Sequence, residues 1–151
     1  MTHKRKIALV AHDNRKADLI DWVKWNQKKL LKHNLVCTGT TGKMVKEALK
    51  IKGAKAKKIT MLKSGPLGGD LQLGALITER KIDILIFFWD PMQPQPHDVD
   101  VKALLRIAVV YNVPFACNRS SADYFITSDL VEEDYQPAIK DYSAYLNREV
   151  K

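Results

Sequence analysis

The residues best suited to chemistry in this chain lie in a glycine-rich segment, residues 64–70, with the sequence SGPLGGD. The segment follows a short apolar run, residues 59–62, that predicts a buried strand, and it precedes apolar residues at helical spacing over residues 71–80. A glycine-rich turn between a strand and a helix start is typical of an anion site. Glycine lets backbone N–H groups approach a phosphate closely, and the helix N-terminus adds the positive end of a dipole.

Asp70, the last residue of this segment, has two interpretations. It stands where the N-cap of the predicted helix would be, and Asp is among the favoured cap residues. Alternatively, its carboxylate is a catalytic base beside a phosphorylated ligand. The segment alone favours the cap, because caps are common, and only the rest of the chain can change that balance.

A second segment rich in hydroxyl groups, residues 38–42 (TGTTG), follows another short apolar run, residues 35–37. One such segment usually caps a helix, but two of them on neighbouring connections favour a phosphate site. Lys16 would add a point charge for the same anion, or else it is an ordinary surface lysine. No Gly-x-Gly-x-x-Gly follows the first apolar run and no Gly-Lys-Ser/Thr occurs, so the dinucleotide-binding and P-loop classes are disfavoured.

His97 lies in a third polar segment, residues 90–100, which also holds Asp90, Asp98 and Asp100. Three prolines fix the path of this segment and argue against a helix in it. One histidine among scattered aspartates is weak support for a metal site, and a hydrogen-bonded catalytic histidine is an equal alternative. We expect no metal.

Apolar runs alternate with helical patterns along the whole chain. This alternation predicts an α/β fold, namely a three-layer, flavodoxin-like parallel sheet of about five strands with helices on both faces, in a single domain over residues 1–151. The expected strands cover residues 7–11, 35–37, 59–62, 82–89 and 113–117, and the clearest helical patterns cover residues 19–31, 44–49, 71–80 and 101–110. Residues 141–148 form either a last helix or an arm that docks on a neighbouring subunit.

Ligands of such sheets bind beyond the carboxyl ends of the strands. Polar residues follow each expected strand and should therefore meet on one rim, where two histidines and several aspartates beside a phosphate site suit proton abstraction next to a carbonyl. In strand order they are His12, Asp13 and Lys16, then Thr38, Gly39, Thr40 and Thr41, then Ser64, Gly65 and Asp70, then Asp90, His97, Asp98 and Asp100, and finally Asn118.

The formal net charge is +8, from 25 Lys and Arg against 17 Asp and Glu, which suggests nucleic-acid binding as an alternative. Many of the lysines fall within residues 43–58, where they fit a solvated helix face and the loop after it, so we expect no nucleic-acid partner. A positive field also steers a small phosphorylated substrate.

The chain has no apolar run long enough for a membrane span, and Cys37 and Cys117 read as buried free thiols, so we expect a cytoplasmic protein with no membrane partner.

The motifs together resemble the bacterial methylglyoxal synthase family. They are residues 11–13 (AHD), 38–42, 64–70, 87–91 (FFWDP) and 96–106 (PHDVDVKALLR), which occur in the family's order and span nearly the whole chain. The resemblance implies a lyase that converts dihydroxyacetone phosphate to methylglyoxal and inorganic phosphate without a cofactor. It also implies a homohexamer for which inorganic phosphate is an inhibitor as well as a product.

The resemblance also implies roles for individual residues. Asp70 would be the base that removes a proton from the hydroxymethyl carbon, Asp100 would assist later proton movements, and His97 would contact the carbonyl and hydroxyl oxygens. His12 would line the substrate site, and Asp13 and Gly39 belong to the same substrate-binding motifs. The phosphate would be held by Lys16, Thr38, Thr40, Thr41, Ser64 and Gly65.

An ordinary Asp, with a pKa of about 3.9, is a poor base toward carbon. Exclusion of water and a phosphate dianion would raise the pKa of Asp70, whereas the helix start would lower it. The enediolate formed by proton removal loses phosphate only if the C–O bond stands perpendicular to its plane, and we expect the two phosphate-binding segments to impose that twist.

The alternative to an enzyme is a binding module that holds a phosphate or nucleotide without turnover.

Overall fold

The fold is built on one five-stranded parallel sheet. The structure is a computed structural model, and it describes residues 3–150, so the ends of the predicted domain, residues 1, 2 and 151, lie outside the described part. The strands run in the order β3-β2-β1-β4-β5, with β1 at the centre. Their bounds are β1 (Lys6–Ala11), β2 (Asn34–Thr38), β3 (Ile59–Leu62), β4 (Ile84–Phe88) and β5 (Phe115–Ala116).

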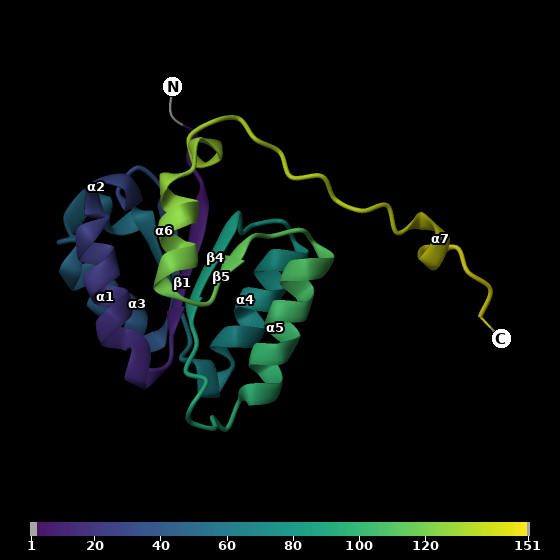
Figure 1. The fold of residues 1–151 in the computed structure, drawn as a ribbon, viewed down its shortest axis with the longest axis horizontal. Coiled ribbons are helices and arrows are strands. Elements are labelled where there is room, and N and C mark those ends of the chain that lie inside the picture. The colour runs from purple at the N-terminus through teal and green to yellow at the C-terminus, as the bar shows by residue number, and fades with distance from the viewer. Residues whose placement is uncertain (1–2, 151) are drawn as a thin grey trace.

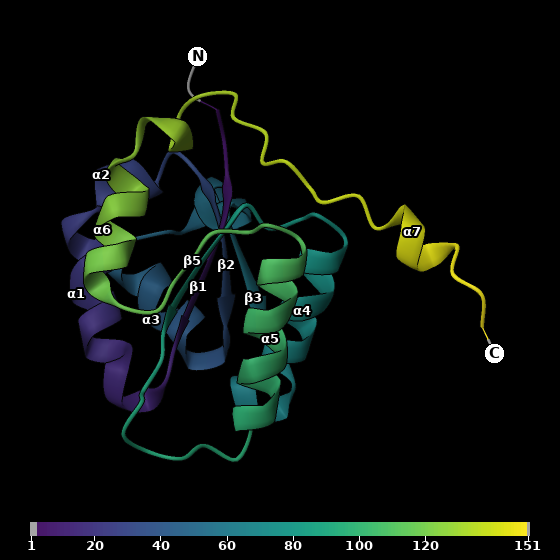
Figure 2. The ribbon, with the colours of Figure 1, turned by 45° about the vertical axis from the view of Figure 1, so that its right-hand side comes forward.

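Helices cover both faces of this sheet, as Figures 1 and 2 show. On one face lie α1 (Lys16–Trp25), α3 (Gly39–Ala48) and α6 (Arg119–Thr127), and on the other lie α4 (Gly69–Thr78) and α5 (Asp98–Val110). Two shorter helices are α2 (Gln27–Leu30) and α7 (Ser143–Leu146). The predicted fold class, a three-layer α/β fold with a flavodoxin-like parallel sheet, is confirmed.

The apolar runs that form β1, β2 and β4 are buried on both faces of the sheet. The edge strand β3, predicted to be buried, instead exposes Thr60 and Met61, because it has a neighbouring strand on one side only. In β1, Ile7 and Leu9 belong to the core cluster beneath α1, α3 and α6, whereas Ala8 and Val10 belong to the cluster beneath α4 and α5. Successive side chains of a strand point to opposite faces, so a strand covered on both sides must be apolar at every position. Five of the six residues of β1 are buried, which is why no alternation appears in its sequence.

The connections that follow β1 and β4 leave these two strands toward opposite faces of the sheet. The chain passes from β1 to α1 on one face and from β4 to α5 on the other, while β1 and β4 pair side by side from Ile7 with Ile84 to Ala11 with Phe88. A reversal of this kind opens a crevice beyond the carboxyl ends of the two strands. The strand order thus places the segments after β1 and after β4 on either side of one crevice.

Several boundaries differ from the prediction, and three of the differences affect the description of the site or of the helices around it. The helical pattern over residues 19–31 is two helices, because α1 ends at Trp25 and the Asn26 side chain donates a hydrogen bond (3.0 Å) to the Trp22 carbonyl. The strand predicted from residue 82 begins at Ile84. Helix α5 begins at Asp98 and not at residue 101, so Asp98 and Asp100 lie in its first turn, where acidic side chains complement the helix dipole.

The chain after α6 forms an arm. Arg5, buried at the start of β1, donates hydrogen bonds to the carbonyls of Val131 (3.1 Å) and Leu130 (2.9 Å), and beyond this point the arm extends away from the sheet (Figure 1). Of the predicted last helix over residues 141–148, only α7 forms. Among the described residues, no helix combines the length and apolar character that a membrane crossing requires.

Two glycines of α4 should respond in opposite ways to the same substitution. A Cβ on Gly69 would lie 1.9 Å from the Lys63 carbonyl oxygen, whereas a Cβ on Gly74 would meet nothing within 4 Å. We expect Gly69→Ala to lower the free energy of unfolding by about 1–3 kcal/mol or more. Gly74→Ala, the matched control, should raise it by about 0.5–1 kcal/mol. Urea denaturation of both variants measures the difference, and equal values would contradict the packing described here.

Candidate active site

A cavity of about 240 Å³ lies at the carboxyl edge of the sheet, where β1, β2 and β3 end and the segment after β4 folds over. Eleven of its lining residues are ones that the sequence marked. They are His12, Asp13, Lys16, Thr38, Gly39, Thr40, Thr41, Ser64, Gly65, Asp70 and His97. The segments that follow β1, β2, β3 and β4 therefore meet at this cavity, whereas Asp90, Asp98, Asp100 and Asn118, which were predicted on the same rim, do not line it.

Asp100 does not line the cavity; it is half-buried in the first turn of α5. Four lining residues, Val10, Ala11, Pro66 and Gln95, are not among the site residues predicted from the sequence. The only signal for Gln95 was its place two residues before His97 in the proline-rich segment.

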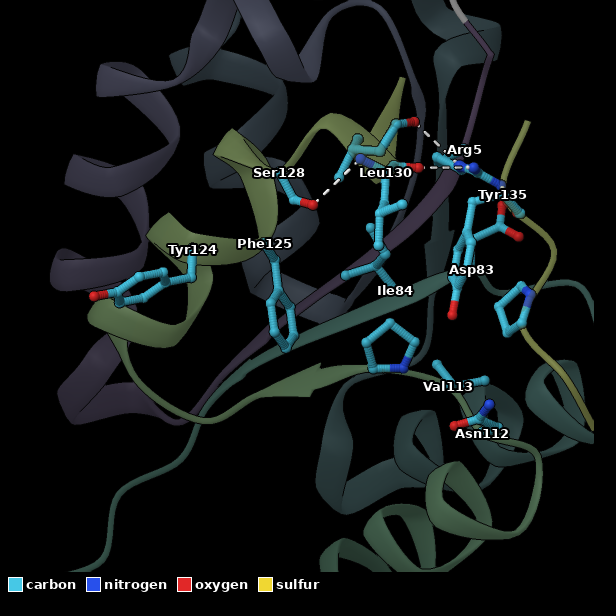
Figure 3. A pocket seen from close by; sticks show the side chains of 13 residues that line it. Arg5, Asp83, Ile84, Asn112, Val113, Tyr124, Phe125, Ser128, Leu130 and Tyr135 are labelled. Carbon is cyan, nitrogen blue, oxygen red and sulfur yellow. Dashed lines mark hydrogen bonds between the residues drawn. The ribbon is translucent and has the colours of Figure 1, made fainter. Parts of the chain in front are cut away.

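A second cavity, of about 390 Å³, lies at the opposite edge of the sheet beside Arg5 (Figure 3). The Arg5 guanidinium there already donates to main-chain carbonyls, among them those of Leu130 and Val131. Within residues 3–150, by contrast, the buried side-chain atoms that lack a hydrogen-bond partner all belong to His12, Asp70 and His97. Unpaired buried polar atoms are costly in a fold, so we assign the chemistry to the carboxyl-edge cavity.

The wall of the cavity formed by α3 and by residues 64–65 suits an anion. Helix α3 begins at Gly39, so the N–H groups of its first turn have no partner within the helix. Gly39 has a φ of +38°, and a Cβ there would lie 2.6 Å from the Ser64 Cα, so the two segments pack backbone against backbone. Lys16 reaches the same cavity from the start of α1 and pairs with the exposed Asp13 carboxylate.

Asp70 is the second residue of α4 and does not cap it. The N-cap is Gly68, whose φ of +103° favours glycine, so the cap interpretation of Asp70 is wrong. The Asp70 side chain is 1% exposed, and neither of its oxygens has a hydrogen-bond partner in the described part of the chain. His97 Nε2 lies 3.3 Å from Asp70 Oδ2, which is within ion-pair distance but outside hydrogen-bond geometry.

Burial raises the pKa of the Asp70 carboxyl above its ordinary value, because removal of water disfavours the charged form. The neighbouring His97 opposes this increase in pKa, and the charge of Asp100 adds to it. Asp100 therefore acts on Asp70 through its charge although it does not line the cavity. The result is a carboxylate that is a stronger base than an ordinary Asp.

His12 and His97 both line the cavity, and their rings contact each other. Their ring centroids are 5.5 Å apart in an edge-to-face arrangement, and His12 also contacts Phe87 edge-on. Burial, reinforced by His97, lowers the pKa of His12, while Asp98 and Asp90 act in the opposite direction. The buried His12 ring is therefore held toward its neutral form.

The other marked residues have structural contacts. Asp90 is buried and accepts hydrogen bonds from the Asn14 side chain (3.1 Å) and the Met92 N–H (3.0 Å). Asp98 accepts a hydrogen bond (3.1 Å) from the Gln95 N–H. Asn118, predicted to reach the rim, instead caps α6 by accepting a hydrogen bond (2.9 Å) from the Ser121 N–H. Within residues 3–150, no group of three or more His, Cys, Asp or Glu is arranged to hold a metal ion.

Comparison with known proteins identifies close relatives. A family model described as "MGS-like domain" matches residues 18–117. The methylglyoxal synthase of Coxiella burnetii (strain RSA 493 / Nine Mile phase I) is 56% identical over 144 residues, which cover 95% of this chain and 96% of that protein. The methylglyoxal synthase of Maridesulfovibrio salexigens is 55% identical, with 99% of this chain and 100% of that protein covered. The crystal structure of methylglyoxal synthase from Elizabethkingia anophelis NUHP1 matches with a TM-score of 0.88 and 51% identity, covering 98% of this chain and 93% of that one.

Gly65 controls the distance between the two groups at the centre of the site. A Cβ at this position would lie 2.6 Å from His97 Nε2 and 3.4 Å from Asp70 Oδ2, so Gly65→Ala should push His97 away. Because His97 lowers the pKa of Asp70, this pKa should rise further in the variant. A ¹³C NMR titration of the aspartate carboxyls measures the change. Gly74→Ala should leave the titration unaltered, and an unshifted Asp70 in Gly65→Ala would contradict the geometry.

Proposed function

This chain belongs to the methylglyoxal synthase family, and from that premise we propose that it converts dihydroxyacetone phosphate to methylglyoxal and inorganic phosphate. One observation carries the proposal. The Asp70 carboxylate is buried, has no hydrogen-bond partner among the described residues and lies 3.3 Å from His97 in a cavity with an anion-binding wall. A carboxylate with free lone pairs and a raised pKa is suited to remove a proton from carbon.

In the reaction that we propose, Asp70 takes a proton from the hydroxymethyl carbon, and the electron pair of the C–H bond moves to the carbonyl oxygen to give an enediolate. His97 donates to the oxygens of that enediolate and so stabilises its negative charge. The C–O bond to phosphate then breaks, phosphate leaves with the bonding electrons, and the remaining enol becomes methylglyoxal by proton transfer. Asp100 assists these later proton movements, which is supported by its electrostatic effect on Asp70.

The phosphate is held at the other side of the cavity. Its ligands are the N–H groups and hydroxyls at the start of α3, the Ser64-Gly65 backbone and the Lys16 ammonium, with His12, Asp13 and Gly39 completing the substrate site. The same groups would bind free inorganic phosphate, which supports its role as both product and inhibitor. The reaction needs no cofactor, because the bases and donors of the chain supply every proton transfer.

We further propose that the chain acts as one domain in the cytoplasm and assembles into a homohexamer. The arm supports assembly, since Tyr145, Leu146 and Val150 are exposed on it and the arm extends away from the sheet (Figure 1). Exposed apolar side chains of this kind mark an interaction surface. Equilibrium sedimentation of the full chain tests the hexamer.

The assay that tests the function mixes the purified protein with dihydroxyacetone phosphate and measures methylglyoxal and inorganic phosphate. Equal amounts of both products are expected. Saturable binding without methylglyoxal would instead indicate a binding module. Strong, salt-dependent affinity for DNA without turnover would indicate a nucleic-acid partner.

Asp70→Asn should separate activity from stability. Loss of the base should lower kcat by about 10²–10⁴-fold or more. Ionisation of an Asp whose pKa is higher in the folded than in the unfolded state destabilises the fold. The destabilisation grows as the pH rises from the unfolded-state pKa to the folded-state pKa, and it persists at higher pH. The variant should therefore have a higher Tm than wild type at pH 7, with the difference shrinking at acid pH. A near-normal kcat would remove Asp70 as the base, and an unchanged or lower Tm would contradict its buried charge.

The phosphate-binding wall should determine the fate of the enediolate. Thr40→Ala loosens the grip on the phosphate, so a larger share of the enediolate should be reprotonated to glyceraldehyde 3-phosphate. The ratio of this product to methylglyoxal measures the effect. Thr60→Ala, at an exposed position on β3 outside the cavity, is the matched control. An unaltered ratio in Thr40→Ala would show that this wall does not impose the twist.

A further inference from the structure

Asp90, directly after Trp89 at the end of β4, contacts both sides of the crevice between β1 and β4. Its main-chain N–H donates a hydrogen bond (3.0 Å) to His12 Nδ1. Its carboxylate accepts from Asn14, which follows β1, and from the Met92 N–H in its own segment. Asp90 is thus fixed at three points and is 4% exposed.

The hydrogen bond from Asp90 determines where His12 carries its proton. In a neutral imidazole one nitrogen donates and the other accepts, and a nitrogen that accepts from a backbone N–H has no proton of its own. The proton of neutral His12 is therefore on Nε2. This Nε2 is buried without a partner in the described part of the chain, and His12 lines the cavity.

We propose that Asp90 is a positioning residue, whose N–H holds His12 as the Nε2–H tautomer so that His12 donates a hydrogen bond to the reacting oxygen of the substrate. The Asp90 carboxylate keeps this N–H in place through Asn14 and Met92. In this state His12 is a neutral donor that stabilises negative charge on oxygen, and it is not a base. The inference rests on the proposed function, because that function supplies the oxygen that accepts.

The position of His12 favours the reacting oxygen over the phosphate. Its ring is edge-on to His97, with 5.5 Å between the centroids, and His97 lies 3.3 Å from the Asp70 carboxylate. The three side chains therefore surround the point where proton removal occurs. The phosphate has its own donors at the start of α3 and in residues 64–65.

Asp83 provides a matched control at the other end of β4. Its carboxylate accepts a hydrogen bond (2.7 Å) from the Lys6 N–H, so it joins the start of β1 to the residue before β4, as Asp90 joins their ends. It lies outside the cavity that holds His12. A substitution at Asp83 disturbs the same strand pair without touching His12.

The first measurement is ¹⁵N NMR of the histidine imidazoles in the wild-type protein, with His12 assigned from the signal lost in His12→Gln. We expect neutral His12 with its proton on Nε2 at pH 7. His33, whose Nδ1 accepts from the Arg5 N–H (3.1 Å), is an internal reference for this tautomer. A proton on Nδ1, or a charged ring at pH 7, would overturn the inference. This result does not depend on turnover.

The second measurement compares variants. Asp90→Ala should give a mixture of His12 tautomers and lower kcat on the order of 10²-fold, as expected for a misplaced catalytic group, with KM changed less. Asp90→Asn retains an oxygen acceptor for the Met92 N–H and should recover part of kcat. Asp83→Asn should leave the His12 tautomer and kcat as in wild type. Loss of kcat in Asp90→Ala with an intact tautomer would overturn the positioning role.

Binding of inorganic phosphate distinguishes a His12 hydrogen bond to the reacting oxygen from one to the phosphate group. If His12 donates to the reacting oxygen, His12→Gln should lower kcat while the Kd for phosphate stays within about twofold of wild type. A Kd that rises in proportion to the lost kcat/KM would place the donation on the phosphate and overturn the inference. If wild type has the expected tautomer but forms no methylglyoxal, the proposed function fails, and the donation to substrate fails with it.

Discussion

The site depends on a buried carboxylate, that of Asp70, for which residues 3–150 provide no hydrogen-bond partner. Asp70 is 1% exposed, and its position in the first turn of α4 gives it no capping role, because Gly68 is the N-cap. A buried charge without partners normally costs a protein stability. In Asp70 the same features supply reactivity. The missing hydrogen bonds leave the lone pairs of the carboxylate free, and burial raises the pKa of the group.

Close backbone packing makes this arrangement possible. Gly69 lies against the Lys63 carbonyl, Gly39 lies against Ser64, and Gly65 leaves room for His97 beside Asp70. In each case a Cβ would require atoms to move. The glycines of residues 64–70 therefore do more than expose N–H groups to a phosphate: they bring α4, the third strand's end and the segment after β4 within contact distance.

Hydrogen bonds to the backbone position the second half of the site. The segment after β4 contains three prolines, yet it has a defined path because Asp90 and Asp98 accept main-chain N–H groups within it. Its end becomes the start of α5, which places His97 immediately before the helix and Asp100 within the first turn. This segment, which contains no helix or strand before α5, thus positions His97 and donates a hydrogen bond to His12 through the Asp90 N–H.

The sequence by itself determined the fold class and the members of the site. Continuous apolar runs alternating with helical patterns required a parallel sheet covered on both faces, and polar residues after each run had to meet at its carboxyl edge. Only the tertiary structure decided which of them touch. Asp70 became buried and lost its predicted capping role, and Asn118 became a cap. His12 became an acceptor for the Asp90 N–H, because β1 pairs with β4 as well as with β2 and so brings the two strand ends together. Strand order and burial are properties of the packed chain, and no local pattern of residues encodes them.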